Sequence, residues 1–592
     1  MLFNYRDYNS QASAALIQKA WDLALYAYHG RSGDTGKLYQ QGGISPENLT
    51  KMLASDAAES AQMKQEVDSR VHESGWRNIT PGMLGYHQAT DSNGTWHGEA
   101  GIYKAAELEV MGKFDSDNKL TGLALSFRGT SGPLEDEPLD TLLDRIAYLN
   151  FLYPDVLAAQ RGSYVENAFS ELIEKIKQYA ESNNLAAEDI LITGHSLGGG
   201  AVNNMAEISD TAWDGFFANA NYIAFASMYM KDDNPDKILN IGFNDDPVYK
   251  VIADGKLNIA SLFFNFHPEK QSAVNNLYLY SDIDTLAEPG KSLGLFQSVN
   301  WLIGHDAHNY DNTLTTLLSS PLYAQMSRES AVVVSYLSDK TRDVEWVSLH
   351  SENTPRGAGQ FIIGSDHDDL LRAAGDTRVD GRGGTNTFQA LQGHNSLYGS
   401  GGDDVFDTQH AASGLNLATD GETFYTLSDE GGITIGHDIH WLEIKTAAGG
   451  REKISTLTPS SALDKLSGQK LESSEGDIGA TQSDSWLFAR DDNHTLTGSS
   501  GRDMFVFEGG EHTVFSGGGE DIFIFHATSG KQIIVDSNDQ SQFIFHGLPG
   551  MSEQELNRAI SSNGHDTIID LGSFSVTLQN VTQFDLHQLH FI

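Results

Sequence analysis

The chain has 592 residues, more than a single hydrophobic core normally serves, so at least two domains are expected. Its 38 Lys and Arg stand against 81 Asp and Glu, and the net charge of -43 disfavours nucleic acid and anionic membrane surfaces as partners and favours cations. The absence of cysteine excludes disulfides, thiolate catalysis and cysteine-ligated zinc sites.

The N-terminal stretch MLFNYRDYNSQASAALIQKAWDLALYAYHG predicts an amphipathic helix. It lacks the basic start, the apolar run and the small-residue cleavage site of a Sec-type signal peptide. Nowhere does the sequence contain the run of about 18 apolar residues that a membrane-spanning helix needs. We therefore expect a protein that is soluble or that lies on surfaces only transiently.

Residues 1–355 predict a domain in which strands and helices alternate. Apolar stretches typical of strands, such as LTGLALSF (120–127) and DILIT (189–193), are separated by helical patterns such as the one over 164–183. This order favours βα units around a mostly parallel sheet. From about residue 356 the chain becomes rich in Gly, Asp, Asn and Ser, which indicates a second, β-rich domain over 356–592.

The stretch LITGHSLGGG carries a G-x-S-x-G pattern, formed by Gly194, Ser196 and Gly198, between an apolar strand and a helix-compatible segment. This is the context of a nucleophile elbow, in which glycines permit the strained turn that lifts the serine hydroxyl clear of the sheet. The N-terminus of the following helix would help to stabilise an oxyanion. An ordinary Gly-rich βα turn is the alternative interpretation.

A nucleophilic serine needs a histidine base and an acid, which follow it in the order Ser, Asp, His in this kind of fold. An apolar strand downstream ends in Asp245 and Asp246, and spacing alone does not separate the two. Further on, His305 and His308 follow an apolar segment, and His267 is a weaker third candidate for the base. At this point both acids and all three histidines remain candidates.

The second domain repeats every nine residues, in one array over 363–407 and another over 480–524. The eighth position of each unit is apolar: Leu370, Val379, Phe388, Leu397 and Phe406 in the first array, and Leu487, Leu496, Phe505, Val514 and Phe523 in the second. Most units have Gly at the fourth position, where a tight turn requires positive φ. A flexible Gly/Asp linker is the alternative, but a linker has no reason to keep an apolar residue in register.

These units are degenerate copies of the G-G-x-G-x-D-x-U-x nonapeptide and resemble the calcium-binding RTX parallel β-roll. In such a roll, Gly-rich turns and Asp carboxylates surround a hard cation, while each eighth residue points into a thin core. Good oxygen ligands occupy the sixth position only in alternate units, so they share one edge if two units make one turn. We therefore expect calcium at one edge of each roll, with ligands Asp368, Asn386, Gly402 and Asp404 in the first and Asp503, Gly519 and Asp521 in the second.

The chain as a whole resembles family I.3 of the true lipases, the RTX lipases that Gram-negative bacteria export by type I secretion. The residues that carry the resemblance are FRGTSGP (127–133), LDTLLD (139–144), GHSLGG (194–199), NIGFNDDPVY (240–249), IGH (303–305), FIIGSD (361–366) and HDTIIDLGSFSVTLQNV (565–581). The resemblance implies an α/β-hydrolase domain followed by an all-β parallel β-roll domain. It also implies Ser196 as nucleophile, Asp246 as orienting acid and His305 as base, with the oxyanion on the N–H groups of Leu197 and Thr130.

The resemblance further implies lids and a calcium site in the first domain, with lids at about 133–156 and about 40–70. Calcium would hold the first lid open, through the ligands Asp140, Asp144, Ser131 and Glu107. Taken alone, Asp140 and Asp144 share one face of a helix and favour a solvated acidic surface. A second calcium site of the family is expected to be weakened, because Asn275 and Asn276 stand where a carboxylate is needed.

The expected function is that of an extracellular, calcium-dependent lipase that hydrolyses triacylglycerols through an acyl-enzyme. A phospholipase A1 or a polyesterase with the same triad is one alternative, and a non-enzymatic RTX surface protein is an alternative of another class. The expected partners are lipid at an oil–water or membrane interface and the ABC exporter of type I secretion, which the apolar tail FDLHQLHFI fits. We expect a monomer that binds no nucleic acid and whose acidic repeats fold only in the calcium outside the cell.

Overall fold

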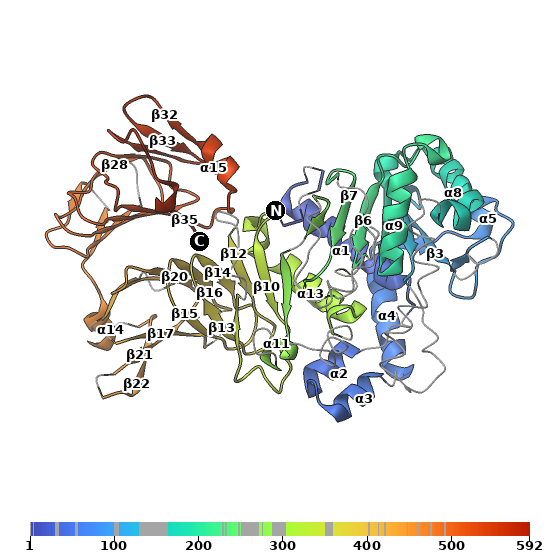
Figure 1. Ribbon diagram of the computed structural model, residues 1–592, viewed down its shortest axis with the longest axis horizontal. Helices are drawn as coiled ribbons and strands as arrows, with labels where there is room; N and C mark the ends of the chain where they lie inside the picture. The colour runs from blue at the N-terminus through green and yellow to red at the C-terminus, as the bar shows by residue number, and fades with distance from the viewer. Residues whose placement is uncertain are drawn as a thin grey trace. The chain divides into compact units, whose positions relative to one another are not determined.

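The structure is a computed structural model (Figure 1). It describes residues 2–3, 5–6, 8–29, 35–53, 57–99, 106–129, 164–227, 230, 234–244, 246, 249, 271–274, 276–286, 303–349, 359–400, 403–411, 414–419, 422–446, 448–458, 461–473, 476–490 and 493–592. The chain forms two compact units: an α/β unit of Phe3–Leu318 and Tyr336–Thr341, and a roll unit of Met1–Leu2, Ser319–Ser335 and Arg342–Ile592.

The α/β unit is built on a sheet with the strand order β1, β3, β4, β5, β6, β7, β8, in which β2 also pairs with β3. From β4 to β8 neighbouring strands run parallel, as the alternation of strand and helix patterns predicts. The bounds are β1 (Trp76–Asn78), β2 (Trp96–His97), β3 (Glu107–Phe114), β4 (Leu120–Phe127), β5 (Ile190–His195), β6 (Asn221–Phe225), β7 (Ile238–Ile241) and β8 (Ala273–Val274), with β9 (Leu277–Tyr280) as a further strand.

Helices cover both faces of this sheet. On one face, apolar side chains of α8 (Tyr164–Ser182) and α9 (Leu197–Ile208) join alternate strand residues in a continuous core. On the other, Ser126 and Thr193 donate hydrogen bonds of 2.8 and 3.0 Å to carbonyl oxygens of α1 (Ser10–Tyr26), because successive strand residues point to opposite faces. The remaining helices are α2 (Thr35–Gly42), α3 (Pro46–Leu53), α4 (Ala57–Glu73), α5 (Pro81–Leu84), α11 (Asp282–Leu286) and α13 (Ala307–Ser319).

The roll unit contains two parallel β-rolls, each made of two sheets. The sheet orders are β11-β13-β15-β17-β21-β22 and β10-β12-β14-β16-β20-β19-β18 in the first roll, and β23-β25-β27-β29-β31-β35 and β24-β26-β28-β30-β34-β33-β32 in the second. Consecutive repeat units therefore alternate between two sheets, and two units make one turn, as expected. Two short helices, α14 (Ser461–Leu466) and α15 (Glu553–Ala559), accompany the strands.

The strands of the rolls are short, as the nine-residue period requires. Those of the first roll are β10 (Ala331–Ser335), β11 (Trp346–Ser348), β12 (Gln360–Ile363), β13 (Leu370–Ala373), β14 (Thr377–Asp380), β15 (Thr387–Ala390), β16 (Asn395–Tyr398), β17 (Val405–Ala411), β18 (Leu415–Thr419), β19 (Thr423–Ser428), β20 (Ile433–His437), β21 (Trp441–Lys445) and β22 (Arg451–Ser455). Those of the second roll are β23 (Lys470–Ser473), β24 (Ile478–Gly479), β25 (Trp486–Ala489), β26 (Thr495–Thr497), β27 (Met504–Phe507), β28 (His512–Phe515), β29 (Ile522–His526), β30 (Lys531–Ile534), β31 (Gln542–His546), β32 (Ile560–Ser562), β33 (Thr567–Asp570), β34 (Ser575–Leu578) and β35 (Leu589–Phe591).

The eighth positions of the repeats form the cores of the rolls. In the second roll Leu487, Phe505 and Phe523 lie opposite one another on neighbouring strands and are fully buried. The rings of Phe505 and Phe523 stack with their centroids 5.1 Å apart. Stacking of like residues from turn to turn is what the strict period predicts, and it gives each thin roll a continuous apolar centre.

One eighth position, Leu370, was expected inside the first roll, and this expectation is wrong. Leu371 is the fully buried residue and pairs with Phe388, whereas Leu370 pairs with Thr387 and is only partly buried. The doubled residues in SDHDDLL make both registers compatible with an apolar interior. Since a shift of one residue exchanges the two faces of a strand, the pattern alone did not fix the register here.

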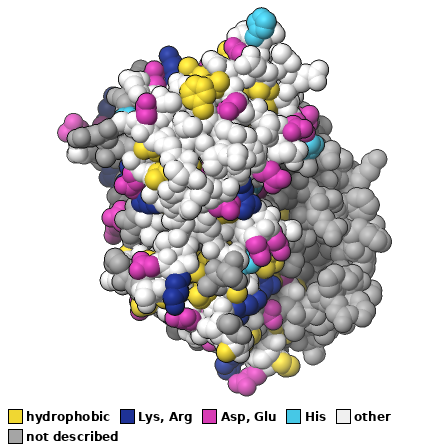
Figure 2. Space-filling model, turned by 90° about the vertical axis from the view of Figure 1, so that its left-hand side faces the viewer, with side chains coloured by type: hydrophobic (Ala, Val, Ile, Leu, Met, Phe, Trp, Pro, Cys, Tyr) yellow, Lys and Arg dark blue, Asp and Glu magenta, His cyan; other side chains and the backbone are white. Residues whose placement is uncertain are grey.

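On the face of the molecule shown in Figure 2, the acidic side chains are not gathered into one patch. Figure 2 shows Asp and Glu side chains dispersed over the face in view, with Lys, Arg and single hydrophobic side chains between them. No helix of the described segments combines the length and the apolar character needed to cross a membrane.

Candidate functional site

Ser196 stands in the sharp turn between β5 and α9, with φ 60° and ψ -122°. A positive φ is unfavourable for a residue with a side chain and persists only where the surroundings enforce it. Two glycines make room for the turn, since a Cβ at Gly198 would lie 2.0 Å from the carbonyl oxygen of Phe127 and one at Gly194 would lie 2.7 Å from it. The chain thus forms the strained strand-to-helix turn that the G-x-S-x-G pattern predicts.

His305, just before α13, links this serine to an acid. Its Nε2 lies 2.9 Å from Ser196 Oγ, and its Nδ1 lies 2.9 Å from Asp246 Oδ2 and 3.0 Å from Asp246 Oδ1. The Asp246 side chain is completely buried, while 11% of the His305 side chain is exposed. A carboxylate on Nδ1 holds an imidazole in the tautomer whose Nε2 can accept a proton from the serine.

Asp246 is further fixed by two donors that are not histidines. The hydroxyl of Tyr310 donates to Asp246 Oδ2 at 2.8 Å, and the N–H of Tyr249 donates to Oδ1 at 3.3 Å. Burial, followed by the negative charge of Asp246, raises the pKa of Tyr310 well above its ordinary value, so the hydroxyl stays protonated. Tyr310 was not predicted from the sequence; it lies in α13, five residues after His305, and belongs to no catalytic motif.

The other candidates for acid and base differ in their placement. His308 lies in α13, and the polar contact that its backbone makes is a 2.9 Å hydrogen bond from its N–H to Asp306 Oδ1. Asp245 and His267 lie outside the described residues. Among the described candidates, Asp246 and His305 are those that the fold brings to Ser196.

One of the two expected oxyanion donors, Leu197, directly follows the serine. Leu197 is the first residue of α9, so its N–H is among the helix-terminal donors that have no acceptor within the helix. Thr130 lies outside the described residues, but Gly129 before it passes the elbow closely, since a Cβ there would lie 2.9 Å from His195 O. The chain after β4 therefore runs beside the elbow, as an oxyanion loop must.

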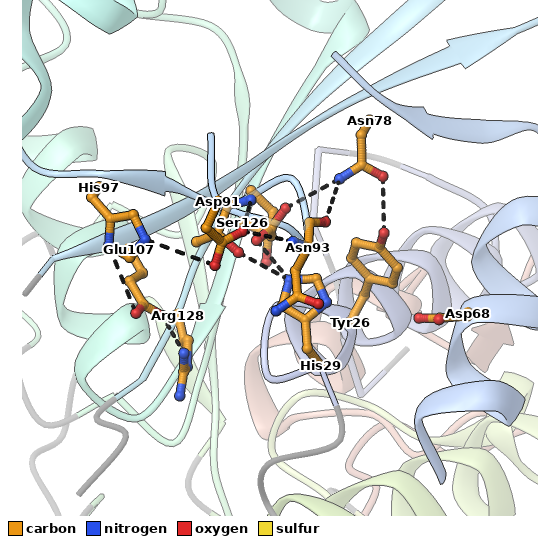
Figure 3. A network of polar contacts seen from close by, with 12 residues as sticks. Tyr26, His29, Asp68, Asn78, Asp91, Asn93, His97, Glu107, Ser126 and Arg128 are labelled. Carbon is orange, nitrogen blue, oxygen red and sulfur yellow. Dashed lines mark hydrogen bonds and ion pairs between the residues drawn. The ribbon is translucent and has the colours of Figure 1, made fainter. Parts of the chain in front are cut away.

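Of the expected lid-calcium ligands, Asp140, Asp144 and Ser131 lie outside the described residues, as does the lid segment 133–156. Glu107 is described, and its Oε2 forms an ion pair with Arg128 Nη1. Figure 3 shows this pair together with His97, whose Nδ1 lies 3.8 Å from Glu107 Oε1. Glu107 thus has a cationic partner from the chain itself. The second expected lid segment, 40–70, contains parts of α2 and α4 and all of α3.

The second roll carries a ladder of carboxylates on one edge. The N–H of Ser485 donates to Asp503 Oδ1 and the N–H of Asp503 donates to Asp521 Oδ1, both at 3.0 Å and both across 18 residues. Burial, followed by the charges of Asp503 and Asp536, raises the pKa of Asp521 to about 7. Its Oδ2 is buried and has no hydrogen-bond partner among the described residues.

These features fit a bound cation. A buried carboxylate oxygen without a hydrogen-bond donor is unfavourable unless a positive charge pairs with it, and calcium prefers oxygen ligands of this kind. Among the described residues no three His, Asp or Glu side chains converge on one point, so a calcium ion here would also take main-chain carbonyl oxygens. Gly519, expected to contribute one, has φ 112°, which a residue with a side chain rarely adopts.

The first roll has the same ladder, but its first step uses a different residue from the one expected. The N–H of Asn386 donates to Asp404 Oδ1 at 2.5 Å, and the N–H of Asp369 donates to Asn386 Oδ1 at 3.0 Å. Asp369 thus holds the position expected for Asp368, whose exposed carboxylate instead accepts the N–H of Thr385 at 2.7 Å. The register shift that moves Leu371 into the core also moves Asp369 into the ladder. Gly402 lies outside the described residues.

Similar proteins define the class. No family model matches the sequence. A lipase from Pseudomonas fluorescens is 33% identical over 386 residues, which cover 62% of this chain and 78% of the relative. A second lipase from Pseudomonas fluorescens is 30% identical over 383 residues, which cover 62% of this chain and 83% of the relative. The crystal structure of the extracellular lipase LipA from Serratia marcescens matches with a TM-score of 0.84 at 30% identity, over 100% of this chain and 99% of that one.

The parallel sheet flanked by helices and the two rolls define an α/β hydrolase followed by a parallel β-roll region, so the predicted fold class is confirmed. The chain belongs to the bacterial lipases of family I.3, the RTX-type lipases. It is accordingly an ester hydrolase of the lipase class, and the prediction of an enzyme is confirmed.

Proposed function

We propose that the enzyme hydrolyses triacylglycerol esters at an oil–water interface, with Ser196 as nucleophile, His305 as general base and Asp246 as the acid that orients the base. One observation carries the proposal: His305 lies 2.9 Å from Ser196 Oγ and 2.9 Å from Asp246 Oδ2. These separations allow a serine proton to pass directly to the imidazole. The lipase relatives support lipid esters as the substrate class.

In the proposed reaction His305 Nε2 takes the proton of Ser196 as its Oγ attacks the acyl carbonyl, and the buried Asp246 stabilises the imidazolium. The negative charge on the carbonyl oxygen develops at the N-terminus of α9, where the N–H groups of Leu197 and Thr130 would bind it. His305 then gives the proton to the departing glycerol oxygen, which leaves an acyl ester on Ser196. Water, deprotonated by the same base, releases the fatty acid and restores the serine.

We infer that the rolls bind calcium and that they therefore fold only after the chain has reached the calcium outside the cell. The orphaned Asp521 Oδ2 and the ladder through Asp503 support a cation at this edge. Metal binding to such a site contributes directly to folding free energy. Type I export of an unfolded chain followed by folding in external calcium is the proposed sequence, and the related LipA is an extracellular lipase.

Fatty-acid release from emulsified triacylglycerol and from phosphatidylcholine vesicles, each with and without calcium, tests the proposal. We expect hydrolysis of triacylglycerol to dominate and to fall at least about a thousandfold in Ser196→Ala. Ser209→Ala is a control for the loss of a serine hydroxyl, because Ser209 lies at the far end of α9 from Ser196 and its hydroxyl donates to Ala206 O at 2.9 Å. This control should keep full activity.

Three results would contradict parts of the proposal. Full activity of Ser196→Ala would remove the assigned nucleophile. Faster release from phosphatidylcholine than from triacylglycerol would replace the substrate class by that of a phospholipase. Normal export of a chain that lacks residues 584–592 would refute the role of that tail as a secretion signal.

A further inference from the structure

His195, the residue before the nucleophile, is buried on the α1 side of the sheet. It ends β5, two residues after Thr193, whose hydroxyl already reaches α1. Its ring meets Trp21 edge-on at a centroid distance of 5.6 Å and Tyr310 edge-on at 5.3 Å. Only 3% of the residue is exposed. The histidine of GHSLGG is therefore enclosed by aromatic rings and takes no part in the contacts between His305, Ser196 and Asp246.

The same ring lies flat against His305. The two imidazole centroids are 4.9 Å apart and the ring planes are inclined by 27°. Burial, followed by the positive charge of His305, lowers the pKa of His195 well below its ordinary value. His195 is thus a neutral ring that covers one face of His305 while Asp246 and Ser196 hold its edges.

Tyr28 holds His195 in this position. Its hydroxyl lies 2.9 Å from His195 Nδ1 inside the protein. Burial raises the pKa of Tyr28, so the phenol stays protonated and is able to donate to Nδ1. On its other side the hydroxyl touches the main chain of Gly129, where a Cβ would lie only 2.0 Å from it. One hydroxyl therefore lies between the elbow and the loop that leads to Thr130.

We propose that His195 and Tyr28 are positioning residues, which fix the plane of the His305 imidazole and hold the elbow against the loop after β4. The inference rests on the proposed catalytic role of His305. The two hydrogen bonds, through Nδ1 and Nε2, lie in the plane of the imidazole and restrain its tilt out of that plane only weakly, and a ring stacked on one face limits this tilt. The stacked ring must be neutral, because a second positive charge would oppose the imidazolium that forms during the reaction.

Three variants separate these contributions. His195→Gln keeps an acceptor for Tyr28 but removes the stacked ring. Tyr28→Phe keeps the aromatic ring and removes the hydroxyl alone. The double variant Tyr28→Phe/His195→Phe keeps a ring against His305 and leaves neither position with an unpaired polar group.

With a soluble ester substrate, we expect His195→Gln to lower kcat about 30-fold with KM changed less than about twofold, since positioning acts on the reacting geometry. Water that replaces the ring would solvate the imidazolium, so the acidic limb of the kcat/KM profile should move to higher pH. Tyr28→Phe should lower kcat about five- to tenfold, the loss of one buried hydrogen bond. The double variant should recover kcat to within about threefold of wild type and keep the wild-type acidic limb.

Tyr222→Phe is the matched control for folding. Tyr222 is as buried as Tyr28 in the same unit, and its hydroxyl donates to Phe217 O at 3.0 Å without contacting the site. It should lower the melting temperature and leave kcat and the acidic limb unchanged.

Wild-type kcat and an unmoved acidic limb in His195→Gln would overturn the inference. It would also be overturned if Tyr222→Phe lost as much kcat as His195→Gln for the same fall in melting temperature. The proposed function fails separately, if Ser196→Ala retains hydrolysis in the same assay.

Discussion

Two fully buried carboxylates, Asp246 in the α/β unit and Asp521 in the roll unit, differ in the hydrogen-bond donors that surround them. Asp246 receives His305, the hydroxyl of Tyr310 and a main-chain N–H, and so every side of it meets a donor. Asp521 receives one main-chain N–H at 3.0 Å, while its Oδ2 has no partner among the described residues and its pKa is raised to about 7.

The difference favours a cation site in the roll unit. Asp246 is surrounded by donors of the chain itself, whereas no cationic side chain among the described residues pairs with Asp521, since Arg502 on the same edge pairs with Asp484. The opposite edge of the same roll repeats the ladder with uncharged groups: His512 Nδ1 accepts the N–H of His494 at 3.3 Å, and Gln532 Oε1 accepts the N–H of His512 at 3.2 Å. Within the roll unit, calcium dependence should therefore be confined to the carboxylate edge.

Asp246→Asn should have the largest effect. The amide cannot hold His305 in the required tautomer, so kcat should fall about 10⁴-fold while KM and the melting temperature change little. Steady-state kinetics and calorimetry in calcium measure both. Asp210→Asn is the control, because that carboxylate is 72% exposed and pairs only with Lys237 on the surface. A loss below about tenfold in Asp246→Asn would show that Asp246 does not orient the base.

Removal of calcium should act next most strongly, and on the roll unit. Two sites at a calcium concentration one hundred times Kd would together contribute about 5 kcal/mol, a shift of about 10–20 °C in a region of this size. Calorimetry in calcium and in chelator should show this shift in the transition of the roll unit. Identical curves in the two buffers would contradict calcium binding at the ladders.

Acidification in excess calcium should weaken the contact between the two rolls. Nε2 of His546, on the second roll, lies 3.1 Å from Nε2 of His437 on the first roll. Nδ1 of His546 lies 3.1 Å from Nδ1 of His526. Each of these two nitrogen pairs can share one proton only, so the three rings together accept no more than one positive charge. Burial, followed by the charges of His526, His437 and Arg378, lowers the pKa of His546 well below its ordinary value. Burial, followed by the charge of His590, lowers the pKa of His394 to about 4.

The sign of this pH effect follows from depressed folded-state pKa values. The unfolded chain binds more protons, so the stabilisation is complete above about pH 6.5 and is lost as pH falls towards about 4, with a contribution of about 3 kcal/mol from His394. Calcium must be in excess, because the raised pKa of Asp521 gives the opposite slope without it. His394→Gln should flatten the pH dependence of the melting temperature, and the exposed His565→Gln should not. An equal slope in both variants would contradict the assignment.

Asp521→Asn should have a smaller effect whose sign depends on calcium. In calcium it should destabilise the roll unit by about 1–3 kcal/mol, because a charged ligand is lost. In chelator it should stabilise the unit, because a buried charge next to Asp503 is removed. His512→Asn, on the opposite edge, should change stability equally in both buffers. A change of one sign in both buffers for Asp521→Asn would place calcium elsewhere.

The features that the sequence predicted well are those with strong local patterns. The turn at Ser196 follows from a strand, glycines and a helix that are adjacent in the chain, and the burial of Phe505 and Phe523 follows from an unbroken nine-residue period. Leu371 and Asp369 were missed because doubled residues satisfied two registers equally.

Sequence patterns did not predict the contacts between segments that are far apart in the chain. Tyr28 and Tyr310 come from the two ends of the α/β unit, and only the folded sheet places them at His195 and Asp246. The choice between Asp245 and Asp246 depended on the family resemblance, since adjacent acids after one strand have the same local signal. Packing in three dimensions, rather than any residue preference, selects these partners.

The most direct test of the central assignment is covalent labelling with a p-nitrophenyl alkylphosphonate, followed by peptide mass spectrometry. Ser196 Oγ should displace p-nitrophenolate from phosphorus and carry the only phosphonate adduct, formed in step with the loss of activity. Asp246→Asn should slow this labelling. Loss of activity without an adduct on Ser196, or with the adduct on another residue, would contradict the account.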